Sequence, residues 1–269
     1  MAARVFTIAN NKGGCGKTTT AANVGAGLRQ AGFDVLLIDA DAQANLTACV
    51  GVVPPPGRTT YDALKAPQTP LIEPVRLDGN GDAGRGVLDV LPAVADLSAV
   101  EAGLVTEADR FARFRAIVDR YRPRYDCIII DTPPAVGMLT ISALCAADAV
   151  IITVQPQYLA VQGLLSLTRT INALNLDGAT VEDTRVLFTQ YDRRKGLHRL
   201  TVERVEAAGF QVYTARVRDN VALGEAPAAG VDIFTYAPRS NGAADYAALV
   251  AEIRTRHHLN HTRNKELTY

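Results

Sequence analysis

The chain has 269 residues, of which 48% are hydrophobic and 21% charged, and its 28 basic residues balance its 28 acidic ones. This composition predicts one globular domain with a substantial core, and the net charge of zero argues against a protein that binds nucleic acid strongly in every state. No apolar run approaches the roughly 18 to 20 residues that span a bilayer, no signal peptide is evident, and the four cysteines form no CxxC pair, so we expect a cytoplasmic protein without disulfides.

The first predicted element is a short apolar strand, Val5–Ala9, which runs into a glycine-rich segment and then a helix. Glycines at a tight turn into a helix N-terminus are typical of a nucleotide-binding loop, because backbone N–H groups and the helix dipole attract phosphate there. The predicted nucleotide-binding residues are Gly13, Gly14, Cys15, Gly16, Lys17, Thr18 and Thr19. Lys17 is expected to reach the terminal phosphates and Thr18 to ligate Mg²⁺. An additional lysine, Lys12, separates this loop from the common kind.

Two carboxylates follow the second predicted strand, Val35–Ile38, in the segment Asp39-Ala-Asp41-Ala-Gln-Ala-Asn45. Phosphoryl transfer mostly needs positioning and charge neutralisation. We assign Asp41 to the attacking water and Asp39 to the metal side. Taken alone, the same residues also fit an Asp-rich turn that caps a helix.

The segment from Gly51 to Gly86 is rich in proline and glycine, including three consecutive prolines and the glycines between positions 79 and 84. This composition predicts a surface excursion with a short helix near Tyr61–Lys65, and not a domain boundary. The third predicted strand, Val87–Leu91, follows it.

A carboxylate also ends the fourth predicted strand, Cys127–Ile130, where Asp131 precedes Thr132-Pro-Pro134. An apolar strand that ends in aspartate has the form of a Walker B element, so Asp131 is expected to coordinate Mg²⁺ through a water. The two prolines stiffen a loop with a switch-type role. Further strands are predicted at Val150–Val154 and Val186–Thr189. Short apolar strands that alternate with helices predict an α/β fold, with a doubly wound, mostly parallel sheet flanked by helices.

Basic residues gather late in the chain. Positions 185 to 218 hold eight basic residues against three acidic ones, a net charge of +5, which predicts a local basic face. The polar tail at 257–269 contains His257, His258 and His261. A metal site is one interpretation of these histidines, but a solvated helix end or frayed tail is the favoured one. We therefore expect one domain over residues 1–256.

Together these motifs carry a resemblance to a known family. The blocks KGGCGKTTT, DADAQANLT, YDCIIIDTPP, ITVQPQYLAVQGL and LGEAPAAGVDIFTYAPRSNGAADYAAL resemble the ParA family of partition ATPases, which are P-loop NTPases of the deviant Walker A type. The resemblance implies ATP and Mg²⁺ as cofactors, with Lys12, Lys17 and Asp41 catalytic and with Thr18, Asp39 and Asp131 at the metal. It also implies an ATP-bound sandwich homodimer in which Lys12 crosses to the nucleotide of the second subunit.

The resemblance further implies binding to nucleoid DNA without sequence preference, and hydrolysis that is slow until a ParB-like partner stimulates it. The DNA-contact residues that it indicates are Arg193, Arg194, Lys195 and Arg199. A second DNA-contact arginine of the family falls on Ala222 here, and Arg218 is the candidate to compensate for it, beside Arg216 or Arg239. Because the phosphate loop opens within a dozen residues of Met1, we expect the short form of the family, without an N-terminal helix-turn-helix extension or operator-specific repression.

Three other functions remain open at this stage. A ParA-like ATPase can position a protein cargo, such as carboxysomes or chemosensory arrays, through an adaptor, and cargo identity resides in that partner. A MinD-like membrane ATPase needs an amphipathic C-terminal helix, but the polar tail offers only Leu259 and Leu267 as bulky apolar residues. A reductase similar to the nitrogenase iron protein needs cluster-binding cysteines, whereas Cys127 and Cys145 lie in apolar contexts that favour burial.

Overall fold

The computed structural model describes residues 2–66, 70–77, 86–107, 109–179 and 181–259. Within them, seven strands form one sheet in the order β3-β4-β2-β5-β1-β6-β7. The strands are β1 Arg4–Ala9, β2 Val35–Asp39, β3 Val75–Arg76, β4 Leu88–Leu91, β5 Cys127–Asp131, β6 Ala149–Val154 and β7 Asp183–Phe188. All neighbouring pairs are parallel except β3 with β4. The predicted α/β class with a mostly parallel sheet is confirmed.

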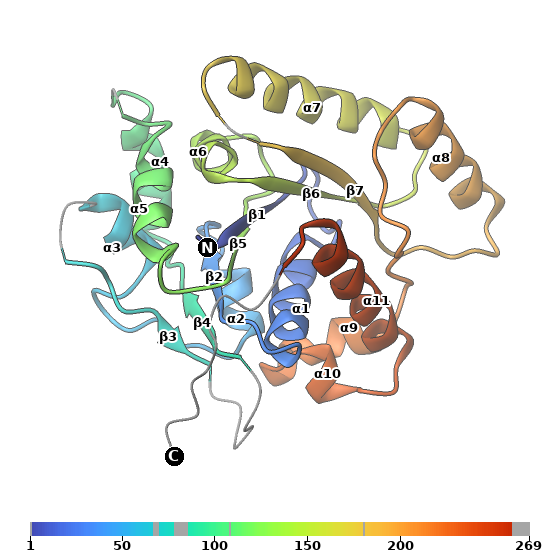
Figure 1. The fold of residues 1–269 in the computed structure, drawn as a ribbon, viewed down its shortest axis with the longest axis horizontal. Coiled ribbons are helices and arrows are strands. Elements are labelled where there is room, and N and C mark those ends of the chain that lie inside the picture. The colour runs from blue at the N-terminus through green and yellow to red at the C-terminus, as the bar shows by residue number, and fades with distance from the viewer. Residues whose placement is uncertain (1, 67–69, 78–85, 108, 180, 260–269) are drawn as a thin grey trace.

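Helices cover both faces of this sheet, with α6 and α7 on one side and α1 and α11 on the other (Figure 1). The helices are α1 Lys17–Gln30, α2 Asn45–Cys49, α3 Thr60–Lys65, α4 Leu97–Leu104, α5 Arg113–Tyr121, α6 Met138–Ala146, α7 Ala160–Leu176, α8 Gly196–Ala207, α9 Val221–Glu225, α10 Ile233–Tyr236 and α11 Asn241–Arg256, with a 3₁₀ turn at Ala226–Ala229. In the described part of the chain no helix combines the length and the apolar character needed to cross a membrane.

The strands are buried on both faces because their side chains alternate between two apolar layers. In β2, Val35 and Leu37 pack in the core cluster that holds α1 and α11 residues, whereas Leu36 and Ile38 pack in the cluster of α3, α4, α5 and α6. A third cluster joins β6 and β7 to α7 and α8. This arrangement explains why the strands read as continuous apolar runs in the sequence.

Glycines on α1 bring that helix close to its neighbours. A Cβ on Gly25 would lie 2.6 Å from Leu37 Cδ2 of the sheet, and one on Gly27 would lie 2.7 Å from Val250 Cγ2 of α11. Contacts this short exclude any side chain without a shift of the surrounding core. Because α1 starts at the glycine-rich loop, this close packing also fixes the position of the loop.

The region from Gly51 to Gly86 is a surface excursion in part only. The predicted short helix is confirmed as α3, with a capping box between Thr59 and Asp62. The sequence did not predict β3, whose two residues add an antiparallel edge to the sheet by pairing with Val90 and Asp89. The glycines between positions 79 and 84 lie outside the described residues.

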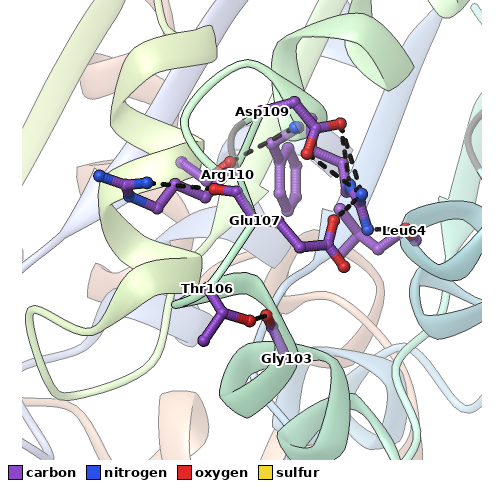
Figure 2. Close-up of polar contacts among 9 residues, drawn as sticks. Leu64, Gly103, Thr106, Glu107, Asp109 and Arg110 are labelled. Carbon is purple, nitrogen blue, oxygen red and sulfur yellow. Dashed lines mark hydrogen bonds and ion pairs between the residues drawn. The ribbon is translucent and has the colours of Figure 1, made fainter.

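Polar contacts shape the connection between α4 and α5 (Figure 2). The guanidinium of Arg113 donates to Glu107 and Asp109, and also to Leu64 O at the end of α3. Arg110 donates to Glu107 O at 3.1 Å. At the preceding helix, Glu101 of α4 accepts from Leu139 N at 3.4 Å, at the start of α6. These contacts join α3 to the connection between α4 and α5, and α4 to the start of α6.

The C-terminal end of α11 is packed against the first strand. The ring of His257 meets Phe6 edge-on, with the centroids 4.9 Å apart, and its side chain is 4% exposed. The boundary at residue 256 stays a prediction, although His257 itself lies against the sheet. His261 lies outside the described residues, and among the described ones no cluster of three or more potential ligands that could hold a metal ion is found.

We predict that His257 makes the protein sensitive to acid. Burial, aided by the charge of Arg4, lowers the pKa of His257 to about 4 although Asp183 acts in the opposite direction. The folded pKa lies below the unfolded value of about 6.5, so stability is retained above pH 6.5 and lost as pH falls toward 4. This shift in the pKa of His257 corresponds to about 3 kcal/mol in the free energy of unfolding. His257→Phe keeps the aromatic contact and should remove this loss.

The measurement is urea unfolding of both proteins between pH 4 and 7.5. Taking the difference between the two proteins cancels the titrating groups that do not interact with His257. A difference in free energy of unfolding that does not change with pH would contradict the assignment.

Candidate functional site

Of the predicted nucleotide-binding residues, residues 13–16 form a tight turn between β1 and α1, and residues 17–19 begin α1. Gly14 and Gly16 have φ angles of 70° and 83°, which residues with a side chain rarely adopt. Gly16 is the N-cap of α1, and no side chain caps that helix start. The N–H groups of Lys17, Thr18 and Thr19 are therefore among those that begin a helix without an internal partner. Such a turn can bind phosphate.

Side chains from neighbouring strands support the back of the loop. Thr189, just after β7, donates to Cys15 O at 2.8 Å, and Thr153 of β6 lies 3.3 Å from Cys15 Sγ. The thiol itself donates to Lys12 O at 3.0 Å and is 1% exposed. Cys15 therefore packs as a small buried residue, and its segment of the loop contacts β6 and the residue that follows β7.

The loop meets the Walker B aspartate directly. Thr18 Oγ1 donates to Asp131 Oδ2 at 2.7 Å, and Lys17 Nζ donates to Lys12 O at 3.2 Å. Asp131 is fully buried, and its Oδ1 has no hydrogen-bond partner among the described residues. Burial, together with the charge of Asp39, raises the pKa of Asp131 well above its usual value. An ionised carboxylate here needs a positive charge nearby, and the charge of Lys17 acts in that direction by lowering the pKa of Asp131.

The other two predicted carboxylates differ from each other in their hydrogen bonds. Asp39 pairs in register with Asp131, and burial raises its pKa to about 6. Its Oδ2 accepts from Thr47 N at 2.9 Å and Thr47 Oγ1 at 2.7 Å, and its Oδ1 accepts from Asp41 N at 3.1 Å. Asp41 Oδ1 accepts from Gln43 N at 2.9 Å, whereas in the described part of the chain its Oδ2 accepts no hydrogen bond. Thr47 was not predicted, because nothing in its sequence position singles it out.

This donor set fits a magnesium ion. Mg²⁺ prefers oxygen ligands, and a hydroxyl and a buried carboxylate meet here with one carboxylate oxygen left unpartnered among the described residues. Thr18 and Asp131 are the residues that would hold the ion. Asp39 lies next to them, but both of its oxygens are already engaged by Thr47 and Asp41, so its assignment to the metal stays a prediction.

A pocket of about 480 Å³ opens beside the phosphate loop. Gly16 and Thr19 line it on the loop side, and Gln190 and residues 217–221 line it on the other. The family resemblance implies that residues 190–192 and 217–218 lie near the adenine. Of these, Gln190, Val217 and Arg218 line the pocket, whereas Tyr191 and Asp192 do not. Gln190 has a φ of 50°, a backbone conformation that the sequence did not indicate.

Lys12 points to two glutamines of its own subunit. Its Nζ donates to Gln157 Oε1 at 2.5 Å and to Gln155 Oε1 at 3.1 Å. These glutamines follow β6, in a block that the sequence marked only as family-like. No charge or motif in the sequence indicated that they would meet Lys12.

The predicted DNA-contact residues gather at the connection between β7 and α8. Arg194 is 86% exposed and bonds to Asp192 at 3.0 Å, and this arginine lowers the pKa of Asp192 to about 2. Arg199 donates to Arg193 O at 2.9 Å, and Lys195 is the N-cap of α8. These four residues form one exposed basic cluster, which we call the α8 cluster: Arg193, Arg194, Lys195 and Arg199.

Arg218 lies near this cluster, because its backbone forms an isolated β-bridge with Tyr191, two residues before Arg193. Its guanidinium is bound by Asp245 of α11, with distances of 2.6 to 3.1 Å. Both Arg194 and Arg218 are paired with a carboxylate, but Arg218 is 43% exposed, so Arg194 is the more accessible of the two.

Comparison with known proteins identifies similar chains over nearly the whole length. A family model described as an AAA domain matches residues 3–181. The chain is 39% identical over 260 residues to the "Chromosome partitioning protein ParA" of Caulobacter vibrioides, covering 94% of both chains. It is 38% identical to the "Sporulation initiation inhibitor protein Soj" of Bacillus subtilis, covering 93% of this chain and 98% of that one.

Among solved structures, it is similar to cobyrinic acid a,c-diamide synthase from Mycobacterium smegmatis with bound ATP analogue and magnesium. The TM-score is 0.79 at 30% identity, over 94% of this chain and 95% of that one.

Proposed function

Because the chain belongs to the ParA family of partition ATPases, we propose that it partitions plasmid or chromosome DNA as an ATP-dependent dimer with a ParB-like partner. It is an ATPase with ATP and Mg²⁺ as cofactors, as in the similar synthase whose structure holds an ATP analogue and magnesium. The observation that carries the proposal is the hydrogen bond from Thr18 to the buried Asp131 at the glycine loop. The other carboxylate oxygen of Asp131, Oδ1, has no hydrogen-bond partner among the described residues. The proposed location is the cytoplasm, on the nucleoid.

We assign the roles in the site from the contacts of each side chain. The loop from Gly13 to Thr19 binds the phosphates, and Lys17 lies inside the loop, where its charge can reach them. Bound Mg²⁺ supplies charge neutralisation at the phosphates. Asp41 holds the attacking water through its free Oδ2. Lys12 reaches the phosphates of the second subunit.

DNA binding is proposed for the α8 cluster, with Arg218 as a weaker neighbour. Contacts of such side chains to phosphate carry no sequence information, which suits a protein that binds DNA at any position. One cluster supplies only a few charges in a chain with no net charge. Two clusters in a closed dimer bind together, so affinity rises only in the ATP state.

The proposal is tested by co-sedimentation with arbitrary duplex DNA in ATP, in ADP and without nucleotide, with molecular mass followed in parallel. A dimer that binds DNA in ATP alone is the expected result. An ATP dimer that ignores DNA would overturn DNA partitioning and favour a protein or membrane surface as its support.

A salt titration then tests the DNA-contact residues. Arg194→Ala should reduce the slope of log affinity against log salt by about 1 for each DNA phosphate that the arginine neutralises, and each dimer carries two such arginines. Arg218→Ala should reduce it less, because the side chain of Arg218 is 43% exposed and that of Arg194 is 86% exposed. Arg169→Ala, which removes an exposed arginine of α7, is the matched control. Equal slopes in all three variants would contradict the assignment.

A further inference from the structure

The exposed ammonium group of Lys12 contacts two side chains of its own subunit. Lys12 Nζ donates to two side-chain carbonyl oxygens, Gln157 Oε1 at 2.5 Å and Gln155 Oε1 at 3.1 Å. The two glutamines are also bonded to each other, since Gln157 Nε2 donates to Gln155 Oε1 at 2.9 Å. Lys12 stands in the phosphate loop, whereas both glutamines stand between β6 and α7. The contact therefore joins two segments that form different parts of the carboxyl edge of the sheet.

The two glutamines differ in what else they support. Gln155 Nε2 donates to Gly14 O at 2.8 Å and to Gln190 Oε1 at 2.8 Å, so it also fixes the phosphate loop and the base pocket. In the described part of the chain, the side-chain hydrogen bonds of Gln157 go only to Lys12 and Gln155. Gln157 is exposed, and a change there leaves the hydrogen bonds of the loop intact.

We propose that Gln157 is a positioning residue that holds Lys12 in a resting orientation, which Lys12 must leave before the ATP dimer closes. This inference rests on the proposed function, in which Lys12 reaches the second subunit. A dimer forms only from subunits whose lysine is free, so the fraction of free lysine sets the ATP concentration at which dimers appear. One hydrogen bond to a charged group shifts such an equilibrium by roughly tenfold.

Two substitutions of Gln157 should act in opposite directions. Gln157→Leu has a similar size but no acceptor, so it removes one of the two hydrogen bonds of Lys12 and leaves the one to Gln155. It should lower the ATP concentration for half-maximal dimerisation by about three- to tenfold. Gln157→Glu places a carboxylate against the ammonium and should raise that concentration by a similar factor. General damage to the loop would move both variants the same way.

The experiment follows molecular mass across an ATP titration at fixed Mg²⁺ for the wild type and both variants. Gln162→Leu and Gln162→Glu are the matched controls, because Gln162 is exposed on α7 five residues further on and forms no hydrogen bond through its side chain in the described part of the chain. They measure the effect of the same changes in size and charge without a contact to Lys12.

A second readout needs no nucleotide. The rate at which a small amine-reactive acetylating reagent modifies Lys12 is followed by mass spectrometry, with Lys195 as the internal reference. Acetylation should be faster in Gln157→Leu and slower in Gln157→Glu than in the wild type.

The outcomes separate this inference from the proposed function. If the wild type fails to dimerise in ATP, the proposed function is wrong, and the acetylation rates alone decide whether Gln157 holds Lys12. If the wild type dimerises but both variants match it, or shift together beyond the Gln162 controls, the positioning role of Gln157 is overturned.

Discussion

Replacing Lys12 by alanine should abolish the ATP-dependent dimer and leave ATP binding by the single subunit nearly intact. The backbone of Lys12, and not its side chain, supports the phosphate loop. Lys12 O accepts from Lys17 Nζ at 3.2 Å and from Cys15 Sγ at 3.0 Å, and Lys12 N donates to Asn10 Oδ1 at 3.1 Å. Alanine preserves all three contacts. What it removes is an exposed ammonium group that contacts two glutamines of its own subunit.

In the proposed dimer that ammonium group faces phosphate at a closed interface. Removing one member of such a charge pair costs about 2 to 5 kcal/mol, which weakens association by a factor of roughly 30 to several thousand. Sedimentation velocity with ATP and Mg²⁺ measures the dimer, and a fluorescent ATP analogue measures binding to the subunit. Lys65→Ala, which removes a lysine on α3 far from the loop, is the control. Loss of ATP binding together with the dimer would place Lys12 in the nucleotide cradle of its own subunit.

The parts of the site that the sequence predicted are those where chemistry and local geometry coincide. Gly14 and Gly16 need positive φ angles, and Asp131 ends a strand of continuous apolar residues. Each feature leaves a mark at a fixed place in the chain, so a tight turn and a strand end can be recognised without a structure. The same holds for α3, because its capping box joins Thr59 to Asp62, three residues further along the chain.

The parts that the sequence did not predict depend on contacts between distant residues. The pairing of Lys12 with Gln157 spans 145 positions, and glutamines carry no charge that would indicate a partner. Strand β3 has only two residues, too few for an alternating pattern, and its place is set by β4. His257 follows a polar helix end, yet it is buried because Phe6 of β1 lies beside it.

The proposed assignment of the water to Asp41, and not to Asp39, is supported by the same kind of contact. Asp39 is fully buried, and its two oxygens accept three hydrogen bonds from Thr47 and Asp41. A carboxylate used in this way organises the loop between β2 and α2. Asp41 uses one oxygen for Gln43 N and keeps Oδ2 for another donor. Of the two, Asp41 can therefore accept a hydrogen bond from a water without breaking the loop.

Asp41→Asn should accordingly reduce ATP turnover by about 10² to 10⁴, the usual contribution of a positioned acid or base, while the dimer still forms. Asparagine keeps an oxygen for Gln43 N, so folding should not change, and dimers should accumulate on DNA in ATP because hydrolysis no longer releases them. Asp96→Asn is the control, since Asp96 makes no side-chain capping bond at the start of α4. Phosphate release and DNA co-sedimentation, followed in one sample, test both expectations. Normal turnover in Asp41→Asn would refute the assignment to the water, and turnover that disappears together with the dimer would mean that Asp41 acts in closing the interface.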